Sequence, residues 1–466
     1  MLIQLTIENF LSFKEEITFS MVGINSDKNY PNHLAVDAAG KGKSLLPISA
    51  IYGANAAGKS NLIKAINFAQ DLIVQGTRSG QTIPVIPFKL GNDRNKPSKF
   101  EFIFIYNDSR YSYGFKLKAD RIIEEWLYVI PSGKKREVPV FVRVTSEKKE
   151  TTVEYGATLK GKGEKDKPFL DFIARGTRPN QLFLTEALDR NVQAVKPVVE
   201  WFEDVLTIIQ AESNYIHLES GILNSQEFTS FLTDFLRLTG TGIDSIGTEE
   251  VELDFDRHFP EIPENIKNDI LETFSEDDDN FVGMLLINQR KRYLIAKRTE
   301  DKLNLIQLKT QHRHQDGSLV DFLIEEESEG TQRLIDLIPV LFVLKNSRNK
   351  VIFLDELDRR LHPLLSRKFI EFCLSCRNKN NRTQLIFTTH DTNLLDLDLL
   401  RRDEIWFVEK NQEGASHLYS LAEFKTKPEL KIEKGYLNGR FGAIPFFGDI
   451  RNLGWFDCEK ESSEAI

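Results

Sequence analysis

The stretch Ile51-Tyr-Gly-Ala-Asn-Ala-Ala-Gly-Lys-Ser-Asn61 is the part of the sequence that decides the fold. Its core, from Gly53 to Ser60, reads G-x-x-x-x-G-K-S, the pattern of a phosphate-binding P-loop. Glycines let the backbone wrap closely around phosphate oxygens, and the helix that follows presents unpaired N–H groups to the anion. Lys59 can reach the β- and γ-phosphates of a nucleotide, and the Ser60 hydroxyl can hold Mg²⁺. The nucleotide-binding residues predicted here are Gly53, Asn55, Gly58, Lys59, Ser60 and Asn61.

The sequence on both sides of this loop has the order that a P-loop requires. Pro47 to Tyr52 is an apolar run, which predicts a buried strand. Asn61 to Asp71 carries apolar residues at helical spacing, so we expect a helix directly after the loop. Strand, glycine loop and helix therefore follow one another as in a nucleotide-binding α/β fold.

Length and composition narrow the class of protein. The 466 residues are enough for two or three hydrophobic cores, at roughly 150 residues each. The net charge of −9 argues against a protein that coats nucleic acid, but it is compatible with a local basic groove. No segment approaches the roughly 20 apolar residues of a membrane-spanning helix, and we see no secretion leader. Because the chain has only 3 cysteines, we expect a reducing, cytoplasmic setting, with Cys373 and Cys376 packed in the core.

Secondary-structure patterns divide the chain into three parts. Residues 2–20 alternate like a hairpin, and four β-rich segments follow the P-loop helix, namely Phe100–Tyr106, Arg110–Leu117, Ile122–Ile130 and Val138–Thr145. From about residue 186 the pattern becomes helical, with predicted helices at Val192–Leu206, Glu227–Leu238 and Glu264–Phe274. Strand patterns resume at Phe281–Ile287 and Tyr293–Arg298. We therefore expect one domain assembled from residues 1–185 and 281–466, with a helical, possible oligomerisation insertion at 186–280.

Two further apolar runs end in residues that can act on a nucleotide. Val351 to Leu354 is followed by Asp355 and Glu356, and the ends of buried parallel strands are where an α/β sheet places its ligand chemistry. Asp355 would hold Mg²⁺, and Glu356 would polarise the water that attacks the γ-phosphate. A second run, Thr383 to Thr389, ends at His390, whose imidazole could contact the γ-phosphate or the attacking water.

A turn before a long apolar helix offers a second anion site. Ser328-Glu-Gly-Thr-Gln332 precedes an apolar run that begins at Leu334. A serine N-cap followed by free N–H groups can bind an anion, although alone it is an ordinary helix start. Beside the other motifs, it makes Ser328, Gly330 and Gln332 candidates for nucleotide binding.

The order of these motifs resembles that of the ABC-type ATPases. The details are similar to the SMC- and RecF-like branch, which starts with a strand and an Asn-Phe pair such as Asn9-Phe10 and extends the P-loop to Gly-Lys-Ser-Asn. Most similar are small stand-alone ATPases related to the overcoming-lysogenization-defect (OLD) family. Their signature is often Ser-x-Gly-Thr, as at 328–331, and Leu-His-Pro follows their acidic strand, as at 361–363. The tail Gly435–Pro445 matches as well, whereas residues 186–280 carry none of these motifs.

This resemblance implies an α/β fold, an ABC-type P-loop head with an antiparallel β subdomain and a helical insertion. In the family, two heads enclose two ATP molecules and pair through them. One head would supply Lys59, Ser60, Asp355, Glu356 and His390, and the opposite head would supply Ser328 and Gly330. Asp358 resembles the residue that couples the two sites across the interface. Gln181 stands at a junction where the family uses a glutamine to sense Mg²⁺ and water, so the resemblance implies that it belongs to the metal site.

The resemblance also implies an Mg²⁺-dependent ATPase, with ATP and Mg²⁺ as its cofactors. The first expectation is a switch or scaffold subunit of bacterial anti-phage defence that controls a separate, nuclease-like effector. Relatives of this size include ATPase partners in PARIS- and Septu-type systems and ATPases beside RloB-like proteins. The alternative is a RecF-like repair ATPase that binds duplex DNA.

Two basic runs keep nucleic acid open as a partner. Lys134-Lys-Arg136 and the stretch from Arg290 to Arg298 could face a phosphate backbone. Short basic runs are more often solvated strand edges, so the charge pattern alone does not decide between the two functions.

Overall fold

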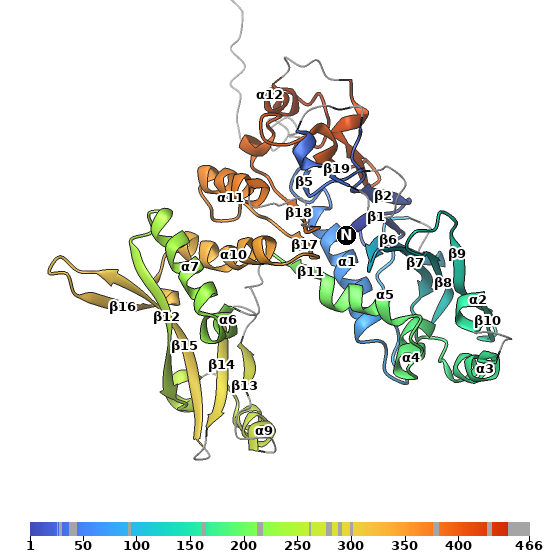
Figure 1. Cartoon of the computed structure of the whole chain (residues 1–466), viewed down its shortest axis with the longest axis horizontal. Helices are drawn as coiled ribbons and strands as arrows, with labels where there is room; N and C mark the ends of the chain where they lie inside the picture. Colours follow the sequence, from blue (N-terminus) through green and yellow to red (C-terminus); the bar gives the residue numbers. More distant parts are fainter. Residues whose placement is uncertain are drawn as a thin grey trace, which may run out of the picture.

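The computed structural model describes most of the chain. The described residues are 1–25, 27, 30–36, 44–91, 95–160, 165–211, 218–260, 262–275, 282–287, 291–298, 302–375, 382–425 and 431–445. For residues 219–220, 269–270, 272–275, 282–287, 291–298 and 302, the backbone alone is described. Figure 1 shows a head, built from both ends of the chain, and a smaller lobe beside it. Within the described ranges, no helix has the length and apolar character that a membrane crossing needs.

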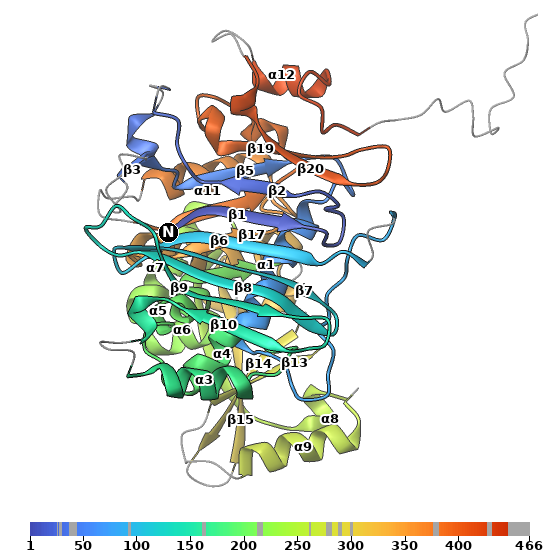
Figure 2. The ribbon, with the colours of Figure 1, turned by 90° about the vertical axis from the view of Figure 1, so that its right-hand side faces the viewer.

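A seven-stranded antiparallel sheet forms one layer of the head. Its strand order is β10-β9-β8-β7-β6-β1-β2, and Figure 2 shows these strands side by side. The strands are β1 (Leu2–Glu8), β2 (Ile17–Ser20), β6 (Ser98–Tyr106), β7 (Ser109–Lys118), β8 (Arg121–Ile130), β9 (Val138–Thr145) and β10 (Thr151–Tyr155). The predicted N-terminal hairpin and the four β-rich segments are thereby confirmed as one antiparallel subdomain.

A six-stranded sheet with the order β11-β17-β18-β5-β19-β20 forms the centre of the head. Its strands are β5 (Ile48–Tyr52), β11 (Leu206–Ile209), β17 (Val351–Leu354), β18 (Gln384–Thr388), β19 (Ile405–Lys410) and β20 (Ser416–Ser420). The first five run parallel, and β20 returns antiparallel to β19. Every residue of β5, β17 and β18 is buried, which explains why these strands are continuous apolar runs rather than alternating ones.

Both faces of the central sheet are covered. On one face, Ile51 and Phe353 pack with α1 (Lys59–Val74) and the seven-stranded sheet in a single core. On the other face, Ile352 and Leu354 pack with α10 (Glu329–Asn346) and α11 (Pro363–Ser375). The predicted fold class, a mixed α/β P-loop head with an antiparallel β subdomain, is confirmed by this architecture.

Short helices connect and cover these sheets. Between the seven-stranded sheet and β11 lie α2 (Ala157–Lys160), α3 (Lys167–Gly176), α4 (Phe183–Asp189), α5 (Lys196–Glu200) and a π-helical turn at Trp201–Val205. A small β3–β4 pair (Ala35–Val36 and Ser44–Leu45) precedes β5, and α12 (Ile432–Leu437) packs its Tyr436 against Phe407 of β19.

The lobe beside the head contains a second antiparallel sheet. Its strands are β12 (Ile243–Glu252), β13 (Val282–Ile287), β14 (Lys291–Arg298), β15 (Lys302–Arg313) and β16 (Leu319–Leu323), with β15 paired to β12, β14 and β16. The lobe also has α6 (Leu218–Asn224), α7 (Gln226–Leu238), α8 (Phe255–His258) and α9 (Glu264–Ser275). Figure 1 shows α7 and α10 between this sheet and the head.

Residues 186–280 are less helical than their pattern predicts. They contain four helices of the lobe, but also β11 and β12, and the lobe sheet continues to residue 323. The strand β11 is four residues long and directly follows the π-helical turn, so its apolar residues extend a helical pattern. The strand β12 is partly exposed and rich in acidic residues, which hides its alternation.

Candidate nucleotide site

The P-loop lies between the central strand β5 and α1, as the sequence predicts. Gly58 has a φ of 124°, a left-handed conformation that glycine adopts at little cost, and a side chain there would collide with Ser416. A side chain at Gly53 would run into the backbone oxygen of Val408. Gly58 is the N-cap of α1 and offers no side chain to cap the helix, so the first N–H groups remain for an anion.

Lys59 is buried at the floor of this loop. Its Nζ donates hydrogen bonds to the carbonyl oxygens of Gly53 at 2.8 Å and Ala54 at 3.1 Å. The same nitrogen lies 3.5 Å from Nδ1 of His390. Burial lowers the pKa of Lys59 to about 8, against the opposing effect of Asp355, Glu356 and Asp358.

Ser60 and Asn61 open the helix, but they have different surroundings. Ser60 is half-buried in the first turn of α1. The Asn61 amide instead donates a hydrogen bond to the Ser12 hydroxyl at 2.8 Å. Ser416 donates its N–H to the Ser12 carbonyl at 2.7 Å and its hydroxyl to the P-loop carbonyl of Ala57. Asn61 and these two serines therefore hold the loop, while Asn55 is exposed at its tip.

The acidic pair follows β17 at the carboxyl edge of the sheet. Asp355 is 5% exposed, and its Oδ1 accepts a hydrogen bond from the Thr388 hydroxyl at 2.6 Å. Glu356 has a φ of 51°, and its N–H donates to the same hydroxyl at 2.7 Å. The Glu356 carboxylate is partly exposed, 3.7 Å from Nη1 of Arg359. The pair therefore consists of a buried acid fixed in position and a second acid that can reach a ligand.

His390 completes the same edge from the neighbouring strand β18. Its backbone N–H donates to the Asp358 carboxylate at 3.2 and 3.3 Å. Burial first, and then the charge of Lys59, lowers the pKa of its imidazole below the ordinary 6.5. At neutral pH the ring is therefore uncharged, with one nitrogen able to accept a hydrogen bond and the other to donate one.

The signature turn starts α10. Ser328 is the N-cap, and its Oγ accepts the N–H of Thr331 at 3.2 Å. The Gln332 amide reaches back to the carbonyl of Glu327 at 2.8 Å, and Gly330 lies against the carbonyl of Arg360, 3.0 Å from where a Cβ would stand. Ser328 is exposed at the start of this helix.

The signature helix is tied to the acidic pair of its own chain. The buried Arg333 donates from Nη2 to the carbonyls of Asp355 at 3.3 Å and Glu356 at 3.1 Å. Glu329 lies 3.2 Å from Nη2 of Arg360. The first turns of α10 are thus hydrogen-bonded to the backbone of the two acids.

Gln181 is not brought to this site, contrary to the expectation that it belongs to the metal site. Its loop is bound to the far end of α1, where Thr185 donates to the carbonyl of Ile73 at 3.1 Å and Thr77 donates to that of Asn180 at 2.7 Å. The 16 residues of α1 span about 24 Å, so this end is remote from Ser60. The Gln181 amide is used locally, in a 2.8 Å hydrogen bond to Glu186.

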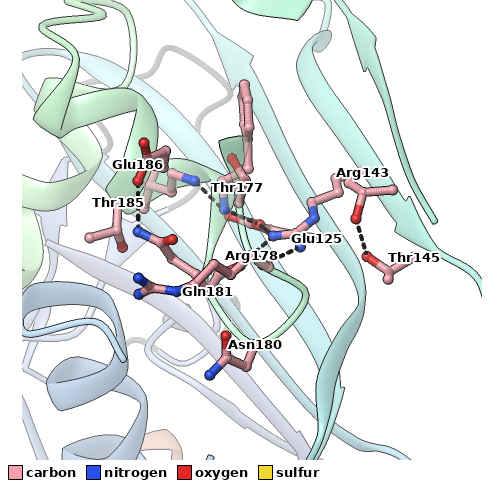
Figure 3. A network of polar contacts seen from close by, with 12 residues as sticks. Glu125, Arg143, Thr145, Thr177, Arg178, Asn180, Gln181, Thr185 and Glu186 are labelled. Atoms are coloured by element: carbon pink, nitrogen blue, oxygen red, sulfur yellow. Dashed lines mark hydrogen bonds and ion pairs between the residues drawn. The ribbon is translucent and has the colours of Figure 1, made fainter. Parts of the chain in front are cut away.

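A buried ion pair holds the Gln181 loop (Figure 3). Arg143 and Glu125 are both 0% exposed and lie 3.4 Å apart. Arg143 donates to the carbonyls of Gln181 and, at 3.1 Å, Arg178. Glu125 accepts the N–H groups of Phe183 at 2.7 Å and Leu184 at 2.9 Å, and the Tyr113 hydroxyl at 3.0 Å; these three donors complete the network. The loop is thus an anchored part of the β subdomain.

A different glutamine lies beside the acidic pair and was missed from the sequence. Gln210 directly follows β11, which runs parallel to β17 with Ile209 opposite Leu354. The N–H of Asp355 donates to the carbonyl of Ile209 at 2.8 Å, so Gln210 and Asp355 leave the sheet side by side. The sequence does contain a signal for this glutamine, because the apolar run Leu206 to Ile209 ends at a polar residue, as a buried strand at a site would. The predicted helix that extends to Leu206 concealed this strand.

The donor set at this edge fits Mg²⁺. A hydroxyl from Ser60, a carboxylate from Asp355 and an amide oxygen from Gln210 are hard oxygen ligands of the kind that Mg²⁺ prefers beside a nucleotide phosphate. Clusters of three or more His, Cys, Asp or Glu that could hold a metal ion are absent from the described part of the chain.

The described residues include only part of the two basic runs and one of the two cysteines expected in the core. Lys134, Lys135 and Arg136 are exposed in the turn between β8 and β9. Arg290 lies outside the described residues, as do the side chains of 291–298. Cys373 is a buried free cysteine of α11, as expected, whereas Cys376 lies outside the described residues.

Fold and site together define a mixed α/β P-loop head of the nucleotide-binding kind. The chain belongs to the family described as "AAA domain, putative AbiEii toxin, Type IV TA system". The family model matches residues 48–396, which is about three quarters of the length of this chain. No curated protein matches the chain.

Two solved SMC head structures are similar to the chain at low sequence identity. An Smc head bound to the C-winged helix domain of ScpA has 14% identity and a TM-score of 0.38, with 90% of this chain and 97% of that chain covered. The SMC head domain from Thermotoga maritima has 13% identity and a TM-score of 0.34, with 90% and 98% covered. At these TM-scores, the likeness carries no functional argument.

Proposed function

We propose that this chain is an ATP-binding and ATP-hydrolysing switch whose heads pair around ATP and thereby control a separate effector, in a bacterial toxin or anti-phage defence setting. The observation that carries the proposal is the meeting of Lys59, the Asp355–Glu356 pair and His390 at one edge of the parallel sheet. Lys59 opens α1 after β5, the acidic pair follows β17 and His390 follows β18, so residues from distant parts of the sequence meet here. A purely structural sheet edge does not require this combination.

Binding would begin at the P-loop. The uncapped N–H groups of α1 and the Lys59 ammonium would take the β- and γ-phosphates. Lys59 would then exchange its hydrogen bonds with the Gly53 and Ala54 carbonyls for bonds to phosphate oxygens. Ser60, Asp355 and Gln210 would hold Mg²⁺, which when bound supplies positive charge to the phosphates.

Hydrolysis would depend on Glu356 and His390. The Glu356 carboxylate is exposed enough to accept a proton from an attacking water. The neutral imidazole of His390, beside Lys59, would hold the γ-phosphate or that water by a hydrogen bond. Asp358 fixes the backbone of His390, and so positions it rather than reacting.

Head pairing would complete the pocket. Ser328 and Gly330 are exposed or half-buried at the N-terminus of the 18-residue α10, a favourable place for a phosphate. We propose that Ser328 of the partner subunit closes each site and that Gln332 supports this turn through Glu327. ATP would then favour the paired state by binding it more tightly than the separate heads.

The family match bears on the setting in which the switch would act. The family description names a putative toxin and a toxin–antitoxin system. Within the described residues, no group of three or more His, Cys, Asp or Glu is placed to hold the metal ion of a nuclease. This supports a division of labour in which the chain switches and another protein, nuclease-like in our proposal, acts.

Glu356→Gln tests the proposal. It should lower ATP turnover by about 10²–10⁴-fold, because the base is lost. ATP affinity should stay within about twofold, and ATP should now leave the heads paired in size-exclusion chromatography with light scattering. The control is Glu154→Gln, the same change at an exposed site on the edge strand β10. Unchanged turnover in Glu356→Gln would refute its role, and a single-head elution with ATP would refute pairing.

A further inference from the structure

Glu327 stands between the lobe sheet and the signature turn. It directly precedes Ser328, and its side chain is 8% exposed. Its Oε1 lies 2.7 Å from Nε2 of His312 and accepts a hydrogen bond from the hydroxyl of Thr310. Both partners belong to β15, the central strand of the lobe, so the carboxylate is bound entirely from outside its own turn.

The backbone of Glu327 supports the turn at the same time. Its carbonyl accepts the amide of Gln332 at 2.8 Å, and its N–H donates to the carbonyl of Ile324 at 3.2 Å. Ser328 follows at once as the N-cap of α10. A shift of the Glu327 side chain must therefore turn the peptide that leads into Ser328.

The strand that holds Glu327 is firmly part of the lobe. Thr310 is fully buried, and His312 packs edge-on against Phe322 of β16 at 4.8 Å between ring centroids. His312 is also paired with Ile243 of β12. Ile243 of β12 packs in one core with Leu334, Ile335 and Ile338 of α10, and Leu308 of β15 packs against that core, so β15 and α10 are linked by apolar packing as well as by the polar contact.

We propose that Glu327 is a positioning residue through which the lobe sets the signature turn, so that the position of β15 controls head pairing. The inference rests on the proposed pairing function and names the contact that regulates it. A partner that binds the lobe and moves β15 would act on pairing through this carboxylate, without touching the P-loop. Removing the Glu327 carboxylate, or the groups on β15 that bind it, should weaken head pairing and leave ATP binding by a single head intact.

The experiment compares variants in the Glu356→Gln background, where turnover does not interfere. Glu327→Ala removes the carboxylate, and Glu325→Ala is the control, an exposed glutamate two residues earlier. Thr310→Val removes only the buried hydroxyl with little change in volume, and Thr310→Ser returns it. The readouts are the Kd for ATP at low protein concentration, the dissociation constant of ATP-induced pairing, and the thermal midpoint.

Glu327→Ala and Thr310→Val should weaken pairing by about tenfold or more, since each loses a hydrogen bond to a charged group. Their ATP affinity should stay within about twofold, and Thr310→Ser and Glu325→Ala should pair normally. Normal pairing in both Glu327→Ala and Thr310→Val would overturn the inference. So would an equal loss of ATP affinity and pairing, which would show general damage to the head. If the Glu356→Gln parent itself does not pair with ATP, the proposed function fails and this inference with it.

Discussion

Replacing Arg143 with methionine should destabilise the protein strongly, because it breaks a buried ion pair. Arg143 is 0% exposed and binds the Glu125 carboxylate and the carbonyls of Gln181 and Arg178. Methionine is similar in length and apolar, so the change leaves little cavity and chiefly removes charge and donors. The two carbonyls lose buried donors, and Glu125 loses the positive charge that favours its ionised form.

Losing one partner of a buried pair costs about 3–5 kcal/mol. The structure places this change toward the lower end of that range. Glu125 keeps three donors, the Tyr113 hydroxyl and the N–H groups of Phe183 and Leu184, so its carboxylate is not left bare. Glu125 can also take up a proton, which limits the cost of an unpaired charge. We expect a loss of about 3 kcal/mol near neutral pH.

Acidification should recover part of this loss. Burial already raises the pKa of Glu125 above its usual value, and Arg143 lowers it; without Arg143 the pKa must rise further. In the folded variant the Glu125 carboxyl then keeps its proton up to a higher pH than in the unfolded chain. The free energy of unfolding of the variant therefore decreases as the pH rises toward the folded-state pKa of Glu125. As the pH is lowered from neutral toward the usual pKa of a glutamate, the difference in unfolding free energy between wild type and Arg143→Met should therefore narrow.

Urea unfolding followed by tryptophan fluorescence checks both parts, because Trp126 lies in β8 beside Glu125. Arg136→Met, an exposed arginine in the turn before β9, is the control and should change the midpoint little. Glu125→Gln combined with Arg143→Met should abolish the extra pH dependence. A loss below about 1 kcal/mol, or a gap that widens on acidification, would show that the network does not hold the loop as described.

Three further predictions concern the nucleotide. Lys59→Ala should weaken ATP binding by about 10–100-fold in a titration, whereas Lys64→Ala on the exposed face of α1 should not; equal affinities would contradict the P-loop assignment. ATP affinity should fall about tenfold from pH 7 to pH 9, because the pKa of Lys59 is about 8 in the empty site and phosphate favours its charged form. Lys59→Arg should remove most of this fall, and a wild-type profile that is flat would argue against a direct contact. Ser328→Arg should leave single-head ATP binding within about twofold and abolish ATP-induced pairing by Glu356→Gln; normal pairing would refute the contact in trans.

The sequence predicts the parts of the site that lie at the ends of buried strands. A parallel strand covered on both faces is a continuous apolar run, so β5, β17 and β18 could be found, together with Lys59, Asp355 and His390 that follow them. Asn61 was placed correctly next to the P-loop, but its amide bonds to Ser12, which no local pattern indicates.

Gln181 and Gln210 show why other parts of the site could not be predicted from the sequence. Gln181 stands at the junction after the β subdomain, and local sequence gives no sign that Arg143 draws this junction to the far end of α1. Gln210 lies at the site only because β11 pairs with β17, more than 140 residues later in the chain. Pairing between such distant segments is decided by the whole core and not by either segment's own pattern.

The position of the lobe within the chain gives the proposed coupling its physical basis. The lobe leaves the head after Gln210 and returns at Ser328, so each of its ends is joined to a residue that we propose to meet the nucleotide. The helix α10 carries both connections: Leu334 and Ile338 pack in the lobe core, and Leu337 and Leu341 pack on the central sheet. A displacement of the lobe is therefore transmitted along a packed helix, because close-packed cores shift as units rather than deform. Glu327 and Arg333 lie on either side of the signature turn on this path, one bound to β15 and the other to the backbone of the acidic pair. Pairing and hydrolysis should consequently respond together to whatever binds the lobe.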